Sequence, residues 1–329
     1  MPVYVNTNYS ALQGQRYLGN VQNSLTTTYQ RLSSGLRINS AKDDAAGLQI
    51  ADRLTSQING LNQGNRNASD GIALAQTIES GMDEISGMLQ KIRTLTVQAA
   101  NGTNTKEDRA ALSKEATALA TEINRIATQT TFAGKTVLNG MGSSSIFGKD
   151  GAAGGQNGTA GKAGKTGTMT LQIGSNKGDT ISFNIDSVMF SKIADEGGAA
   201  GNNKLVGTDK IFKTDNGTGA VTVTFTKANF ADATNDVYIG KVIELMDTAI
   251  SKVDGMRAGL GALQNRLESS IRNQSNVAAN EADARSRIRD ADFAEESANL
   301  SQQSIIQQAA ASMLMQANTR PQLGLSLLG

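Results

Sequence analysis

Apolar side chains recur every three or four positions near the start of the chain, at Leu18, Val21, Leu25, Tyr29 and Leu32. This spacing places them along one face of a helix. The helix is expected to end at Ser33 to Gly35, because glycine readily adopts the left-handed conformation that closes helices. The stripe therefore predicts an N-terminal helix with one apolar side.

Longer stripes of the same period cover residues 54–99 and 249–277, and a shorter one covers 112–126. The helix that carries the stripe at 54–99 is expected to begin at Ser40, with Asp43 and Asp44 in its first turn. The shorter helix is expected to follow a cap at Thr105 to Asp108. Spacings close to 3.5 residues are typical of helices that pack as coiled coils. The stripes predict long helices packed along one another.

The last predicted helix, from Asp292 to Asn318, follows a joint at 289–292 and is apolar on more than one side. Such a helix must be covered on more than one side. Burial of five apolar side chains gives roughly 8–15 kcal/mol. Ordering about 25 residues costs roughly 25–50 kcal/mol of backbone entropy. We therefore expect both terminal helices to order fully only against other chains, through Leu18, Val21, Leu25, Tyr29, Leu32, Leu300, Ile305, Ile306, Met313 and Leu314.

The middle of the chain has a different pattern. Residues 141–167 form a Gly/Ser/Ala tract expected to be loop. Alternating polar and apolar residues at 169–173 and 180–185 predict a β-hairpin, and 221–225 predict a third strand. The predicted fold is mainly α: a long coiled-coil-like helical rod formed by both chain ends, with a small β-hairpin-containing variable lobe inserted in the middle.

Three regions follow from this pattern. They are a terminal helical region (1–40 and 290–329), a long-helix rod (41–140 and 235–289) and a β- and Gly-rich region (141–234).

Composition removes most chemistry. The formal net charge is +1, and the chain has no Cys, His or Trp. Thiol catalysis, imidazole acid–base catalysis and the usual zinc ligands are therefore absent, and neither nucleic-acid binding nor membrane insertion is indicated. A phosphate-loop-like run at 161–166 lacks the first glycine, and Asp150 and Asp179 are too sparse for calcium. We expect a non-enzyme with no cofactor and no metal.

Four runs of sequence resemble bacterial flagellin: RLSSGLRINSAKDDAAG at 31–47, RNASDG at 66–71, VQAANGT at 97–103 and ADARSRIRDAD at 282–292. The likeness covers roughly residues 1–140 and 235–329. It implies a structural subunit that self-assembles into the helical, tubular flagellar filament used for swimming. The terminal helices of that family form an inner layer, and the long helices surround it.

The resemblance also implies location and partners. The protein is expected to be extracellular, exported by the flagellar type III apparatus without a cleaved secretory signal peptide. Implied partners are identical subunits, cap and hook-junction proteins, and a cytoplasmic export chaperone at the C-terminal helix. A candidate Toll-like receptor 5 surface maps to Lys91, Leu95 and Glu115, although Lys91 replaces the usual arginine and cannot make its forked contact. Candidate O-glycosylation sites are Ser143, Ser144, Ser145, Thr166 and Thr218.

Two other readings remain open at this point. A hook–filament junction protein would share the terminal helices, although the intact run at 31–47 favours the filament subunit. A secreted stalk-like adhesin would use the rod as a support and the lobe as a binding head. Elongation of filament fragments by the purified chain separates a filament subunit from an adhesin.

Overall fold

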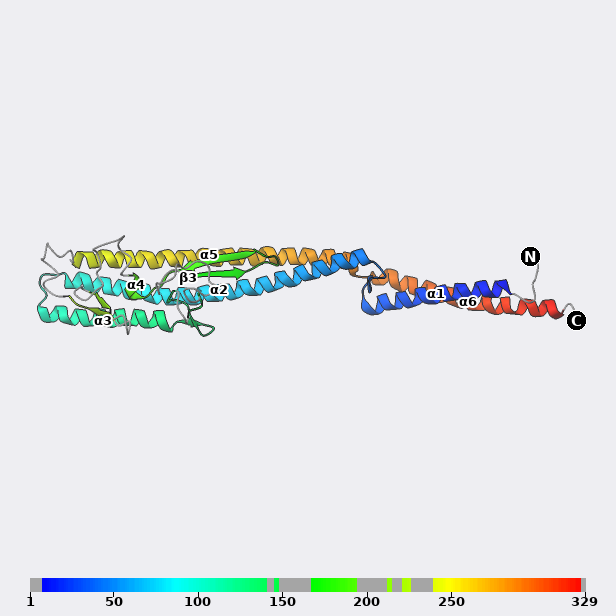
Figure 1. Cartoon of the computed structure of the whole chain (residues 1–329), viewed down its shortest axis with the longest axis horizontal. Helices are drawn as coiled ribbons and strands as arrows, with labels where there is room; N and C mark the ends of the chain where they lie inside the picture. Colours follow the sequence, from blue (N-terminus) through cyan, green and yellow to red (C-terminus); the bar gives the residue numbers. More distant parts are fainter. Residues whose placement is uncertain are drawn as a thin grey trace. The chain divides into compact units, whose positions relative to one another are not determined.

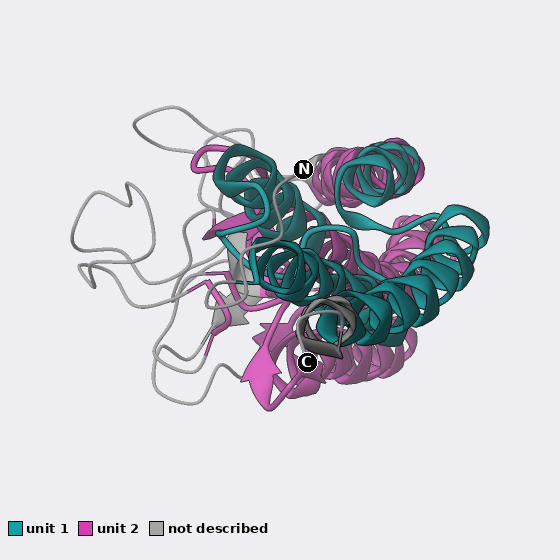
Figure 2. Cartoon of the chain, turned by 90° about the vertical axis from the view of Figure 1, so that its right-hand side faces the viewer, with its two compact units in different colours: residues 1–60, 276–329 teal, residues 61–275 magenta. Residues whose placement is uncertain are grey.

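The computed structural model of the chain describes residues 8–140, 145–147, 167–193, 212–214, 221–225 and 239–326. The chain divides into two compact units, coloured separately in Figure 2. Unit 1 combines both ends of the chain, residues 1–60 and 276–329, and unit 2 comprises residues 61–275. Two long helices, α2 (Ala45–Ala99) and α5 (Ile239–Arg289), each contribute to both units. The predicted mainly α fold with strands in the middle is confirmed. The three-region division proposed from the sequence stays a prediction.

In unit 1, helix α1 (Tyr9–Ser34) lies beside helix α6 (Phe293–Ser326), in blue and red in Figure 1. The side chain of Asn8 caps α1 by accepting a hydrogen bond from the Ala11 N–H. Gly35 ends the helix in the left-handed conformation with φ 72°, and its N–H donates to the Arg31 carbonyl. The predicted end of the first helix is confirmed.

The second helix begins later than predicted, at Ala45 rather than Ser40. The Asp44 carboxylate accepts a hydrogen bond from the Gly47 N–H at 2.9 Å, so Asp44 is the residue that caps the helix. Asp43 instead accepts from the backbone N–H groups of Ser40 and Asn39 and closes a turn ahead of it. Those hydrogen bonds hold the pKa of Asp43 below its ordinary value. Asp43 thus stabilises a turn that the sequence pattern assigned to the helix.

The predicted joint at residues 289–292 is present between α5 and α6. The Arg37 N–H donates to the Arg289 carbonyl at 2.7 Å, and the Ala291 N–H donates to the Gly35 carbonyl at 3.0 Å. The intervening Ile38 is only 1% exposed. The joint is therefore held by backbone hydrogen bonds to the turn that follows α1.

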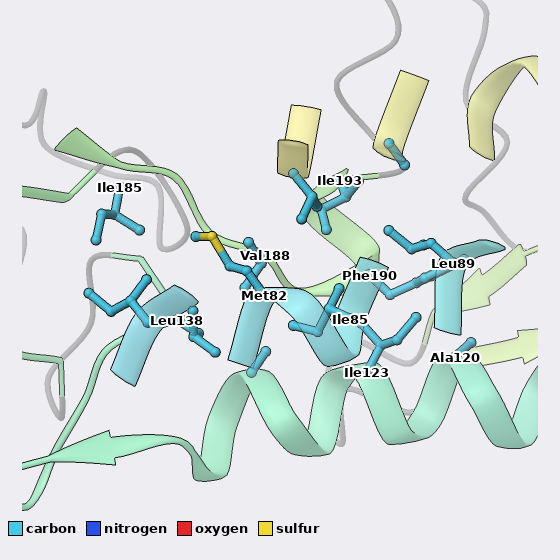
Figure 3. Packing of buried hydrophobic residues seen from close by; sticks show 14 of the residues in the cluster. Met82, Ile85, Leu89, Ala120, Ile123, Leu138, Ile185, Val188, Phe190 and Ile193 are labelled. Atoms are coloured by element: carbon cyan, nitrogen blue, oxygen red, sulfur yellow. The ribbon is translucent and has the colours of Figure 1, made fainter. Parts of the chain in front are cut away.

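The core of unit 2 is formed by α2, α5 and α3 (Lys106–Gln129) with parts of the middle segment. Met82, Ile85 and Leu89 on α2 are fully buried, and Figure 3 shows them between α3 and α4 (Phe190–Ile193). Phe190 itself is 1% exposed. The apolar stripe of α2 is therefore covered within the same chain.

The described part of unit 2 also contains three short antiparallel pairs: β1 (Thr131–Phe132) with β2 (Lys135–Thr136), β3 (Gly167–Gln172) with β4 (Thr180–Ile185), and β5 (Phe212–Thr214) with β6 (Val221–Val223). The predicted hairpin is confirmed as β3–β4, and the third predicted strand is β6. Most of the Gly/Ser/Ala tract, including the phosphate-loop-like run and Asp150, lies outside the described residues.

The β3–β4 hairpin approaches α2 where α2 carries glycine. A Cβ on Gly64 would lie 1.9 Å from the carbonyl oxygen of Ile173, and one on Gly71 would lie 2.5 Å from the Leu171 side chain. Between them, the Asn67 amide donates to the Gln172 carbonyl at 2.8 Å. The two glycines let the hairpin pack closely on the helix.

Polar side chains of α3 hold the middle segment. The Phe225 N–H donates to the Ser113 hydroxyl at 2.8 Å, the Val223 N–H donates to the Thr117 hydroxyl at 2.9 Å, and the Phe190 N–H donates to the Asn124 side chain at 2.9 Å. Because Ser113 and Thr117 are one turn apart, their hydroxyls lie on the same face of α3. These two hydroxyls accept hydrogen bonds from the backbone of residues 223 and 225, as the carbonyls of a neighbouring strand would.

Replacing Ser113 with alanine is expected to destabilise unit 2 by about 1–3 kcal/mol, because the buried Phe225 N–H loses its acceptor. Urea unfolding followed by circular dichroism measures the change. Thr121→Ala is the control, since the exposed Thr121 hydroxyl bonds only to the Thr117 carbonyl of its own helix. Equal effects of the two substitutions would contradict this role for Ser113.

The predicted cap of α3 is confirmed as a capping box. The Asp108 N–H donates to the Thr105 hydroxyl, and the Asp108 carboxylate accepts from the Thr105 N–H at 2.9 Å. Hydrogen bonds from the backbone and hydroxyl of Thr105 lower the pKa of Asp108 from its ordinary value of 3.8. The cap therefore favours the ionised carboxylate.

This cap should make stability depend on pH in acid. Because the pKa of Asp108 is lower in the folded chain than in the unfolded chain, the cap contributes stability above about pH 4. That contribution is lost as the pH falls through the folded-state value. Urea unfolding of Asp108→Asn at several pH values should show a shallower fall below pH ~4 than the native chain. Parallel pH profiles would contradict the assignment.

Candidate assembly surface

The facing sides of α1 and α6 form an apolar seam within unit 1. The α1 residues on this side are half-buried or buried and follow alternating steps of three and four: Ala11, Gly14, Leu18, Val21, Leu25, Thr28 and Leu32. Leu25 is 9% exposed, and Leu300, Ile306 and Leu314 on α6 are half-buried. Gly14 permits close contact, since a Cβ there would lie 3.2 Å from the Leu314 side chain. The spacing is that of a coiled-coil seam.

Polar contacts fix the antiparallel register of the seam. Near one end the Asn8 amide donates to the Ala317 carbonyl at 2.8 Å. Towards the other end the Thr28 hydroxyl donates to Gln303 at 3.4 Å. A third contact, at 3.0 Å, pairs Arg31 with Glu296, whose side chain is 9% exposed. Sliding one helix along the other would break all three contacts together.

Other large apolar side chains of the same helices point away from the seam. Tyr29 is 55% exposed, Ile305 67% and Met313 72%. Five more exposed side chains on α1 and α6 are Tyr9, Leu12, Tyr17, Phe293 and Met315. We call these eight side chains the outer apolar face. A soluble chain rarely leaves so many large apolar groups uncovered on one structural element unless they bind something.

The ten residues selected from the sequence therefore divide between two surfaces. Seven lie on the seam side: Leu18, Val21, Leu25, Leu32, Leu300, Ile306 and Leu314. Tyr29, Ile305 and Met313 lie on the outer apolar face. The ten residues leave out Tyr9, Leu12 and Tyr17 because a single stripe was followed along the first helix. Leu12 and Met315 each follow a seam residue and Tyr17 precedes one, about 100° around the helix. They project to different sides, so they form no second stripe that periodicity could have revealed.

The outer apolar face has little charge around it. In the described part of α1 the only charged side chains are Arg16 and Arg31, and Arg31 is paired with Glu296. In α6 the residues after Glu296 are uncharged up to Arg320. Electrostatic repulsion between copies is therefore weak along this face.

The candidate receptor surface is only partly exposed. Lys91 and Glu115 are exposed and form an ion pair at 3.1 Å. Leu95 is 6% exposed and belongs to the core of unit 2, so it offers little surface to a receptor, and its role stays a prediction. The apolar period of α2 turns Leu95 inward with Leu89 and Ile92. Nearby Arg93 pairs with Asp247 on α5, which raises the pKa of Arg93.

The candidate glycosylation sites are mostly outside the described residues, namely Ser143, Ser144, Thr166 and Thr218. Ser145 is described and is 5% exposed, and its hydroxyl accepts a hydrogen bond from the Phe147 N–H. The expectation of an exposed Ser145 is wrong. A sugar could not be attached there without opening this packing.

Within the described ranges, no three acidic side chains gather in a way that could hold a metal ion. None of the described helices is both long enough and apolar enough to cross a membrane.

Comparison with known proteins gives the family. The model of the bacterial flagellin N-terminal helical region matches residues 5–143, and that of the bacterial flagellin C-terminal helical region matches residues 243–328. Flagellin D of Vibrio anguillarum and flagellin D of Vibrio cholerae serotype O1 are each 38% identical over 379 aligned residues, covering 100% of both chains.

Polar flagellin B/D of Vibrio parahaemolyticus is 37% identical with the same coverage. A solved structure described as a flagellar hook-associated protein from Vibrio parahaemolyticus has a TM-score of 0.53. It covers 75% of this chain and 100% of its own, but at 14% identity the likeness concerns the fold alone. The chain therefore belongs to the bacterial flagellin family, the exported, non-enzymatic structural subunits that polymerise into the flagellar filament.

Proposed function

We propose that this flagellin polymerises through the outer apolar face of α1 and α6, while the seam between the same two helices holds the subunit's own ends together. The observation that carries the proposal is the contrast between Leu25, 9% exposed on the seam, and Tyr29, 55% exposed one turn later. A helix pair that buries one apolar side and leaves another uncovered requires a second partner.

Identical subunits are the partner that this chemistry favours. Each large apolar side chain transferred from water into a contact stabilises it by about 1.5–3 kcal/mol. The outer apolar face offers Tyr29, Ile305 and Met313, and neighbouring copies would supply the same side chains. No charged group has to be desolvated along most of this face. Polymerisation by this route needs neither nucleotide nor metal.

Seeded elongation tests the proposed function. Purified chain is mixed with short fragments of its own filament, and fragment length is followed by electron microscopy. We expect elongation in proportion to the free subunit concentration. Failure to elongate would contradict polymerisation and favour the stalk-like adhesin. Elongation that stops after a few added subunits would instead favour a junction protein.

We also propose that an export chaperone and the cap and hook-junction proteins bind the terminal helices. Before polymerisation, Ile305, Met313 and Met315 leave apolar surface uncovered on α6, which a chaperone would shield. Binding of the chaperone to the full chain and to a chain lacking residues 293–329 can be compared by calorimetry. Equal affinity would contradict a site on α6.

A receptor contact is proposed only on the exposed part of the candidate surface, Lys91 with Glu115. Lys91 already pairs with Glu115 and offers a point charge rather than a fork, so we expect weak activation of Toll-like receptor 5. Reporter cells treated with the purified monomer and with Lys91→Arg test this. A response to Lys91→Arg no stronger than to the native chain would contradict the role of residue 91.

We propose that the exported subunit keeps its N-terminus and carries O-linked sugars on the middle segment. The intact mass of subunits from native filaments tests both features. A mass equal to that of the sequence would rule out sugars. A mass lacking the first residues would contradict uncleaved export.

A further inference from the structure

The two most exposed methionines described in this chain lie on its assembly helix. Met313 is 72% exposed and Met315 67% exposed, both on α6. Met82 and Met246 in unit 2 are 0% and 1% exposed, and Met88, Met169, Met189 and Met256 are half-buried. The thioethers most accessible to a dissolved oxidant are thus on the helix that carries much of the outer apolar face.

Both methionines flank the seam rather than join it. The half-buried Leu314 lies between them in sequence and packs near Gly14 of α1. Successive helical residues are rotated by about 100°, so Met313 and Met315 project to opposite sides of Leu314. Closure of α1 on α6 therefore protects neither thioether.

We propose that Met313 and Met315 form an oxidation site that controls whether a free subunit can join the polymer. This inference rests on the proposed role of the outer apolar face. The oxidant class is a peroxide, with hydrogen peroxide as the simplest member. A sulfur lone pair attacks one peroxide oxygen, the O–O bond breaks, and an S=O bond forms. The sulfur loses two electrons, the peroxide is reduced, and one molecule of water is released.

The sulfoxide changes the chemistry of the outer apolar face without requiring the subunit to unfold. Oxidation turns a flexible apolar side chain into a polar one. Because Met313 and Met315 face solvent in the free subunit, water can solvate the new oxygen there. In an apolar contact between copies that oxygen would lose its water without gaining a donor. Oxidation should therefore weaken addition to the filament far more than it weakens the fold.

The test compares peroxide-treated and untreated full-length subunit. Peptide mass mapping should show Met313 and Met315 oxidised first among the described methionines, and Met82 and Met246 last. At partial oxidation confined to these two residues, the critical concentration for seeded elongation should rise at least about tenfold. Treatment with methionine sulfoxide reductases should restore it. Circular dichroism should stay unchanged.

Variants locate the effect. Each protein is compared with its own untreated sample, so a changed starting affinity does not matter. The peroxide effect should vanish in Met313→Leu/Met315→Leu and persist in the matched control Met88→Leu/Met256→Leu, whose methionines are half-buried. If Met313→Leu/Met315→Leu does not elongate at all, the native chain still tests the inference. Its oxidised methionines are located by peptide mass mapping, and its elongation is measured again after sulfoxide reduction.

Equal elongation by oxidised and untreated native subunit would overturn the inference while leaving the proposed function intact. Preferential oxidation of the unit 2 methionines would overturn it as well. Failure of the untreated native subunit to elongate seeds would instead contradict the proposed function itself.

Discussion

Deletion of residues 1–32 is expected to abolish filament elongation. The deletion removes nearly all of α1, together with the apolar partner of Leu300, Ile306 and Leu314 on α6. A lone helix in water is marginal, and most helical stability comes from packing an apolar side. We expect α6 to lose its helical structure in the free subunit and the outer apolar face to disappear with it.

The rest of the chain should survive this deletion. The core of unit 2 draws its buried side chains from residues 68–267 and therefore contains no residue of α1. Far-ultraviolet circular dichroism should retain the signal of the long helices, and electron microscopy should show no filaments, even on added fragments. The full chain, unfolded and refolded in the same way, is the control. Normal filaments from the truncated chain would contradict the account.

Substitution of Glu296 with alanine is expected to destabilise unit 1 by about 2–4 kcal/mol. Glu296 is 7% exposed and pairs with Arg31 at 3.0 Å across the seam. The substitution leaves the Arg31 side chain, which is 32% exposed, without this partner. Removing one member of a buried pair is costly because the remaining charge stays partly desolvated. Urea unfolding of the free subunit measures the change.

Two further variants separate this pair from a general loss of charge. Asp283→Ala removes an exposed partner of Arg287 within unit 1, where the side chains are 63% and 78% exposed, and should cost less than about 1 kcal/mol. The exchange Arg31→Glu/Glu296→Arg keeps opposite charges at the two positions and should recover part of the lost stability. If Glu296→Ala proved no more damaging than Asp283→Ala, the seam would not depend on the pair.

The helices could be predicted because their signals are local. The period of α2, the capping box at Thr105 and Asp108, and the left-handed Gly35 all depend on residues close in sequence. The start of α2 was misplaced because Ser40, Asp43 and Asp44 are all suitable capping residues. Only the folded turn shows that Asp43 bonds back to Asn39 and Ser40.

Other features depend on contacts distant in sequence, which periodicity does not give. Leu95 matches an exposed motif position, yet the core of unit 2 buries it. Strand Phe212–Thr214 pairs with Val221–Val223, and the Ser113 hydroxyl accepts a hydrogen bond from the Phe225 N–H. Neither contact is indicated by the sequence pattern of the segments that it joins. Similarly, Leu25 and Tyr29 are four residues apart in one stripe, and only the placement of α6 separates them into seam and outer face.

A filament map at side-chain resolution tests the central claim most directly. The account predicts that Tyr29, Ile305 and Met313 are covered by side chains of other copies. It also predicts that Leu25 of α1 still packs against α6, and Leu314 of α6 against α1, within one subunit. A map in which those three outer side chains stay in solvent would contradict it. So would a map in which α1 pairs with α6 of a different copy.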